Sequence, residues 1–194
     1  DWLILARTND KLIKLKSILK EMAIYFEIKD RKSYKTRLYT AVKHYTRWTK
    51  GDKLSLSECK DLFEYLELDQ ELKEERMYDL EEFGYKTTDE WYEVFKSDPE
   101  ECLYIREMLR SGEKLDNPAR VKLSTIHAAK GGEATNVLII LDNTKKIREA
   151  IDKSEDKQDE EHRVWYVGVT RTKQNLYIMT AKQEDRGYDI ESIT

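Results

Sequence analysis

The sequence predicts an α/β protein in which a mainly parallel sheet, flanked by helices, is interrupted by an all-helical insertion. Short apolar runs typical of buried strands occur near both ends of the chain, with helical patterns between them. The middle of the chain has apolar residues at helical spacing and almost no strand pattern. We therefore expect one α/β domain built from residues 1–34 and 113–194, and a helical insertion subdomain formed by residues 35–112.

The N-terminal segment predicts a strand, a helix and a second strand. Trp2–Arg7 is a strand candidate, and Asn9 or Asp10 can cap the helix that follows. Ile24–Ile28 is a second, short strand candidate. The helix is expected to bury one apolar stripe, formed by Leu12, Leu15, Ile18, Leu19 and Met22. A strand–helix–strand order of this kind is typical of parallel sheets.

The insertion begins with a helix predicted over Tyr34–Thr49. Its apolar positions at helical spacing are Leu38, Ala41, Val42, Tyr45 and Trp48. Three further helix starts are indicated by a polar cap with an acid three residues later, namely Ser55 with Glu58, Thr87 with Glu90, and Asp98 with Glu101, the last with Pro99 at the first helical position.

Strand patterns return in the last part of the chain. Three strands are predicted over Val121–Ile126, Val137–Leu141 and Leu176–Thr180, with a helix over Asp159–Val169 between the last two. The polar stretch 143–160 is expected to be a solvated helix or loop. The returning strands are the reason for expecting an interrupted domain.

Composition narrows the class of protein. The chain has 194 residues, 38% of them charged, with no apolar run long enough for a membrane span. Cys59 and Cys102 match no metal or redox spacing, so we expect buried thiols, no metal site, and a reducing, cytoplasmic environment. We also expect a monomer that is part of a longer polypeptide, because the chain opens on a strand at Asp1 without Met.

The charges are unevenly distributed. Residues 1–56 carry 14 Lys and Arg against six Asp and Glu, whereas residues 57–113 carry seven against 19. This asymmetry suggests separate tasks for the two regions. Within the basic region, residues 29–53 hold nine Lys and Arg with four interleaved aromatic residues, Tyr34, Tyr39, Tyr45 and Trp48. The pattern fits either a single-strand binding surface or a solvated helix whose aromatic rings face the core.

Two segments carry chemistry. Thr125–Glu133 reads T-I-H-A-A-K-G-G-E, in which a strand leads into a loop with paired glycines that permits close approach of a phosphate or ribose. A tight turn with a solvated lysine and glutamate has the same composition. Glu160–Arg171 reads E-E-H-R-V-W-Y-V-G-V-T-R, a helix that buries apolar residues and ends at Arg171. By itself, an arginine at this position could simply interact with the helix dipole and the last carbonyls of the helix.

These segments resemble the last two motifs of UvrD/Rep/PcrA-type superfamily 1 DNA helicases, which are a strand ending in T-x-H followed by A-K-G-x-E, and E-E-x-R-x-x-Y-V-G-V-T-R. Leu3–Asn9 resembles, less fully, the family's motif IV, a strand that ends in R-x-N before a helix. The three matches stand in the family's order. Gly132 and Thr172 depart from the usual pattern, since the family mostly has a bulkier apolar residue and an alanine at these positions.

The resemblance implies a second RecA-like motor domain and a set of site residues. Arg171 and Arg7 are expected to approach the ATP γ-phosphate as catalytic arginines. Gly131 and Glu133 are expected at the nucleotide, with Glu133 near the ribose and Lys130 supporting the loop. Thr125 and His127 are expected to face single-stranded DNA, whereas Glu161 and Arg163 are interpreted as scaffolding.

The sequence contains no G-x-x-x-x-G-K-[ST] phosphate-binding loop. We therefore expect the chain to share ATP and Mg²⁺ with an N-terminal P-loop domain that also holds the Mg²⁺ ligands, and to be inactive alone. The alternative is a non-catalytic module, derived from a helicase half, that binds single-stranded DNA or docks a protein.

Overall fold

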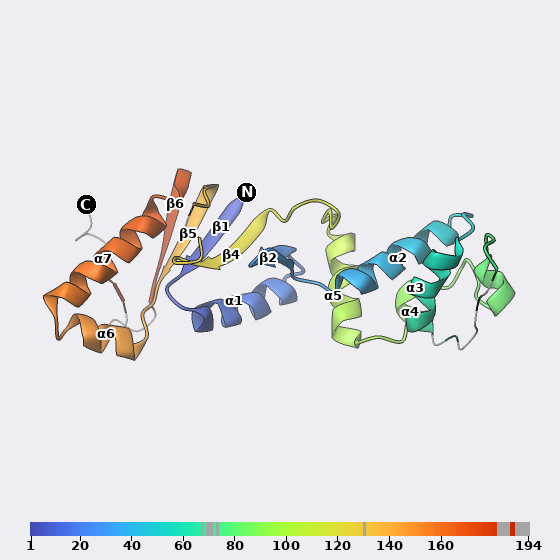
Figure 1. Ribbon diagram of the computed structural model, residues 1–194, viewed down its shortest axis with the longest axis horizontal. Helices are drawn as coiled ribbons and strands as arrows, with labels where there is room; N and C mark the ends of the chain where they lie inside the picture. The colour runs from blue at the N-terminus through green and yellow to red at the C-terminus, as the bar shows by residue number, and fades with distance from the viewer. Residues whose placement is uncertain (67, 69–71, 73, 130, 182–186, 189–194) are drawn as a thin grey trace. The chain divides into compact units, whose positions relative to one another are not determined.

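The chain forms two compact units in a computed structural model that describes residues 1–66, 68, 72, 74–129, 131–181, 187 and 188. The first, called here the sheet unit, comprises Asp1–Ser33 and Lys114–Thr194, and the second, called the helical unit, comprises Tyr34–Glu113 (Figure 1). The chain thus leaves the sheet unit after its third strand and returns to it about 80 residues later.

The sheet unit has a six-stranded sheet in the order β3-β2-β4-β1-β5-β6. All neighbouring strands are parallel except β2 and β3, which form an antiparallel hairpin. The prediction of an α/β protein with a mainly parallel sheet is confirmed. The strands are β1 (Trp2–Ala6), β2 (Phe26–Ile28), β3 (Arg31–Lys32), β4 (Val121–Thr125), β5 (Ala134–Leu141) and β6 (Thr172–Thr180).

Alternate residues of β1 bury against opposite faces of the sheet. Leu3 and Leu5 belong to a core that includes Trp165, whereas Ile4 and Ala6 belong to a core that includes Leu12. The helices that cover these faces are α1 (Asn9–Glu21) on one side and α7 (Glu155–Val169) on the other, with the shorter α6 (Lys145–Ile151) before α7 (Figure 1). This alternation is the expected result of the two-residue period of a strand.

Several boundaries in the sheet unit differ from the prediction. Helix α1 begins at Asn9, with Thr8 at the N-cap in an extended conformation and without a side-chain cap, so neither Asn9 nor Asp10 is the cap. Its stripe is narrower than predicted, since Ile18 and Met22 are 41% and 63% exposed. The hairpin turn at Lys29 and Asp30 has positive φ at both residues, as a type I′ turn requires.

The helical unit contains α2 (Thr36–Trp48), α3 (Leu56–Leu66), a short 3₁₀-helix (Leu80–Phe83), α4 (Trp91–Val94) and α5 (Pro99–Arg110). Ser55 and Glu58 form the predicted reciprocal cap, and Asp98 caps α5. The predicted start at Thr87 is wrong, because α4 begins only at Trp91. The side chain of Asp89 instead accepts a hydrogen bond from the Lys86 amide, which holds that segment in a turn.

The aromatic residues of the basic segment belong to the core of the helical unit. Tyr34, Tyr39, Tyr45 and Trp48 are each at most 8% exposed. Trp48 donates its indole hydrogen to Asp79 at 2.7 Å, and Tyr45 packs edge-on against Phe95. The structure therefore supports the core interpretation of this pattern and excludes these four rings as stacking platforms for bases.

Some charges of the basic region pair with charges of the acidic region. Arg47 of α2 donates to Glu58 of α3 at 2.5 Å, and His44 lies between Glu58 and Asp61. Two side chains of the basic region, Arg47 and His44, therefore lie against acids of α3 in the acidic region.

Candidate functional site

Arg7 follows β1 directly, at the carboxyl end of a central strand. Its Nε donates to both carboxylate oxygens of Glu161, at 2.8 and 3.0 Å. Glu161 belongs to α7, 154 residues away in sequence, and its side chain is 5% exposed against 20% for Arg7. In parallel α/β sheets, ligands bind outside the carboxyl ends of the strands, so Arg7 stands at a position suited to a ligand.

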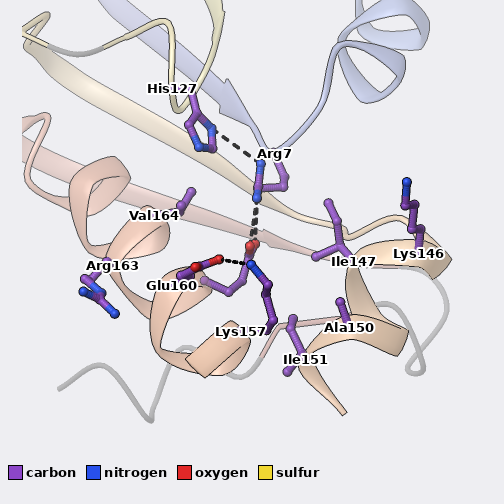
Figure 2. Close-up of a pocket in the computed structure, with 11 residues that line it drawn as sticks. Arg7, His127, Lys146, Ile147, Ala150, Ile151, Lys157, Glu160, Arg163 and Val164 are labelled. Atoms are coloured by element: carbon purple, nitrogen blue, oxygen red, sulfur yellow. Dashed lines mark hydrogen bonds and ion pairs between the residues drawn. The ribbon is translucent and has the colours of Figure 1, made fainter. Parts of the chain in front are cut away.

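His127 lies beside Arg7 in the loop after β4. Its Nδ1 is 3.4 Å from Nη1 of Arg7 (Figure 2). The loop is anchored on either side of His127 by Ile126 and Ala129, which are buried in the core under α7. Because Ile126 and Ala129 are buried and His127 is exposed, the imidazole lies at the surface on an anchored backbone.

The rest of the loop shows how its turn is made. The hydroxyl of Thr125 accepts a hydrogen bond from the Ala128 amide at 3.3 Å, which closes the first part of the turn. Gly131 has φ of +87°, a conformation that favours glycine, whereas Gly132 does not use this freedom. Glu133 is exposed, with an oxygen 3.9 Å from Nζ of Lys173. Lys130, predicted to support the loop, lies outside the described residues.

Arg171 lies at the end of α7, one residue before β6. Its Nε donates to the carbonyl of Val167 at 3.0 Å, and Nη2 donates to the hydroxyl of Thr170 at 3.1 Å. Its own carbonyl accepts from the Ala134 amide at the start of β5. In this conformation Arg171 satisfies a terminal carbonyl of its helix, as an arginine at a helix C-terminus can.

The C-terminal half of α7 packs closely on the sheet. A methyl group placed on Gly168 would lie 3.4 to 3.5 Å from the side chains of Ile139 and Ile126. Trp165, one turn earlier, is fully buried in the same core. The helix therefore lies directly against β5 and against the loop that carries His127.

Two adjoining hollows connect these residues. The larger, of about 750 Å³, is lined by Arg7, His127 and Glu161 together with residues of α6 and α7 (Figure 2). The smaller, of about 300 Å³, is lined by Arg171 and Val167 among others. Both hollows share His127, Arg163 and Val164. Arg7 and Arg171 therefore border one continuous surface along α7, although no contact joins them, and Gly131 and Glu133 line neither hollow.

The cations around the larger hollow outnumber the acids. Arg7, Lys146, Lys157 and Arg163 line it, against Glu160 and Glu161. Lys157 is paired with Glu160 at 2.7 Å, and Arg7 with Glu161 (Figure 2). The remaining positive charge favours an anionic ligand.

Glu161, which the sequence indicates as scaffolding, directly contacts Arg7, a predicted catalytic arginine. A signal for this was present in the helix. Glu161 precedes Trp165 by four residues and Gly168 by seven, so all three share the buried face of α7. A carboxylate on a buried face requires a cationic partner, which could have been sought among distant arginines.

Within the described part of the chain, no group of three or more His, Cys, Asp or Glu is arranged to hold a metal ion. Cys59 and Cys102 are buried free thiols in the helical unit, and burial raises the pKa of Cys59 to about 11. No helix among the described residues is long and apolar enough to cross a bilayer.

Comparison with known proteins agrees with the arrangement of these elements. Residues 6–183 match the family described as the UvrD-like helicase C-terminal domain. A stretch of 79 residues is 33% identical to the ATP-dependent DNA helicase Rep of Escherichia coli (strain K12). That match covers 41% of this chain and 12% of the length of Rep, so the chain corresponds to a small part of that protein.

Proposed function

The chain belongs to the UvrD-like helicase C-terminal domain family, and we propose that it is the second motor domain of an ATP-dependent DNA helicase or translocase. In this proposal ATP binds between the sheet unit and a P-loop domain, and the helical unit is the insertion that the sheet unit carries between β3 and β4. The family implies the use of ATP and DNA. The particular residues that contact them in this chain are part of the proposal.

One observation carries the assignment of the site. Arg7 and Arg171 are 164 positions apart in sequence, yet they border adjoining hollows that meet at His127, Arg163 and Val164. Guanidinium groups are planar, permanently charged donors that stabilise the charge spread over a transferring phosphoryl group. Two of them on one continuous surface suit an anion that approaches from outside the sheet unit.

Each proposed residue has a distinct task. Arg7 and Arg171 would stabilise the γ-phosphoryl group, and Arg171 would first release the Val167 carbonyl that it now contacts. Gly131, Glu133 and Lys130 would form the loop that meets the nucleoside. Thr125 and His127 would contact single-stranded DNA, and the contact of His127 with Arg7 would link DNA to the nucleotide. The P-loop domain would supply the phosphate cradle and the Mg²⁺ ligands.

The decisive experiment is DNA-stimulated ATP hydrolysis by this chain joined to its P-loop domain, with and without Arg171→Ala. We expect a fall in kcat of about 10³-fold, the smaller end of the effects known for arginine fingers. Arg171→Lys should not restore the rate, because lysine keeps the charge but lacks the donor fork.

Arg110→Ala provides a matched control, since Arg110 also ends a helix but is exposed in the helical unit. This variant should retain the wild-type rate. If Arg171→Ala also retained it, Arg171 would be a helix cap only. Complete inactivity of the joined wild-type protein, with retained binding of single strands, would instead support the non-catalytic DNA-binding alternative.

A further inference from the structure

Glu161 differs from the other carboxylates around the larger hollow because it is buried. It is 4% exposed, whereas the side chain of the neighbouring Glu160 is 58% exposed and pairs with Lys157 at the surface. Burying a carboxylate is unfavourable unless a cation and hydrogen bonds compensate for the lost water. Among the described residues, Arg7 is the one that donates hydrogen bonds to the Glu161 side chain, and it therefore provides this compensation.

The geometry of this pair leaves part of Arg7 available. Both hydrogen bonds from Arg7 to Glu161 use Nε, so the terminal nitrogens Nη1 and Nη2 remain for other acceptors. Nη1 is directed towards His127, and Arg7 lines the hollow. The carboxylate of Glu161 therefore holds Arg7 through Nε. The edge of the guanidinium that carries Nη1 and Nη2 remains available beside the hollow.

We propose that Glu161 is a positioning residue that holds Arg7 in the orientation required to meet the terminal phosphate of a nucleoside triphosphate. This inference rests on the proposed function, in which Arg7 contacts that phosphate. A free arginine side chain samples many rotamers, and holding it in one orientation before the ligand arrives removes that entropic cost from binding and from catalysis. A buried, rigid carboxylate on a packed helix is suited to this task.

The test compares the joined protein with its Glu161→Gln variant, which nearly preserves size while removing the charge. We expect kcat to fall about tenfold, less than the loss of a direct donor to the transition state. The affinity for a non-hydrolysable ATP analogue should fall, whereas the affinity for ADP, which lacks the terminal phosphate, should stay within twofold. If Glu161 had only a structural role, Glu161→Gln would lower the affinities for the ATP analogue and for ADP by similar factors.

Two further variants complete the design. Glu161→Asp keeps the buried charge, and with it the fold, but its shorter side chain should give a smaller change in the same direction. Combined with Arg7→Gln, Glu161→Gln should have no additional effect on kcat or on the preference for the analogue, because Glu161 acts only through Arg7. Glu107→Gln is the control, since Glu107 accepts from Nε of Arg106 at 3.0 Å in the helical unit.

Failure of the inference can be separated from failure of the proposed function. If Arg7→Gln lowers kcat but Glu161→Gln does not, or if their effects add, the positioning role is overturned while the motor assignment stands. Tighter binding of the analogue by Glu161→Gln with an undiminished rate would likewise overturn it, since the carboxylate would then restrain Arg7. If neither Arg7→Gln nor Arg171→Ala lowers the rate, the proposed function itself fails.

Discussion

Arginine side chains have hydrogen-bonding partners in both units of the chain, but their surroundings differ. In the helical unit, Arg47, Arg76 and Arg106 pair with acids at most 11 positions away, and every one of these pairs is at least partly exposed. In the sheet unit, Arg7 pairs with a buried glutamate 154 positions away, and Arg171 contacts its own helix.

This difference shows that the two units use their arginine residues in different ways. Exposed local ion pairs contribute little to stability and require no special fold, so the arginines of the helical unit can be explained by solvation alone. A buried pair between distant elements forms only if the topology brings them together. The environment of Arg7 and Glu161 therefore depends on the fold and not on the local sequence around either residue.

The largest expected effect tests whether each unit has a core of its own. Trp165 in the sheet unit and Trp48 in the helical unit are both at most 2% exposed. Replacing either tryptophan with alanine should lower the free energy of unfolding by about 3–5 kcal/mol. Hydrogen exchange should show the loss of protection confined to the altered unit, and loss across both units would mean that they unfold together. Tyr166→Ala, at a residue 59% exposed, is the control.

A second prediction uses two glycines with nearly the same backbone conformation. Gly131 and Gly84 have φ of 87° and 88°, and an added methyl group at either would meet no atom within 4 Å. Alanine should therefore lower the stability of each unit by a similar amount, about 1–2 kcal/mol, through backbone strain alone. Only Gly131→Ala should also slow ATP hydrolysis. Equal rates for both variants would remove Gly131 from the nucleotide loop.

A smaller effect is expected on the binding of single-stranded DNA. His127→Ala should weaken binding about fivefold, measured by fluorescence anisotropy at fixed salt, because His127 is exposed and proposed to contact the strand. Tyr39→Leu should leave the affinity of the folded protein within twofold, since a buried ring cannot stack on a base. If Tyr39→Leu lowered the affinity for single-stranded DNA more than His127→Ala did, the DNA contact would have to be assigned to the helical unit instead of the sheet unit.

The smallest predicted effect is the acid sensitivity of the helical unit. Hydrogen bonds from Arg76, and then from the Asp79 amide, lower the pKa of Glu82 to about 2. Because this pKa is below that of the unfolded chain, the stabilising contribution is present above about pH 4.5 and is lost as pH falls towards 2. Glu82→Gln should flatten this part of the stability profile in urea titrations. High salt should reduce the difference between the two proteins, because Glu82 is exposed.

The sequence by itself determined the fold class and most of the elements. Strand and helix periodicity predicted β1, β4, β5, α2 and α7 because apolar residues recur at the spacing of each element. Reciprocal capping predicted the start of α3, and a polar cap with proline at the first helical position predicted the start of α5, because those interactions are local. The resemblance of three short motifs identified the helicase family, which the family match confirms.

Only the tertiary structure decided which charged and aromatic residues serve the surface and which serve the core. The rings of the basic segment turned inward, and Arg47 of α2 paired with Glu58 of α3, because packing between helices is not encoded in either helix alone. The burial of Glu161 and its contact with Arg7 likewise depend on α7 lying against β5 and the loop after β4. The contact between Arg7 and Glu161 joins residues 154 positions apart, so a single sequence supplies the residues but not their pairing.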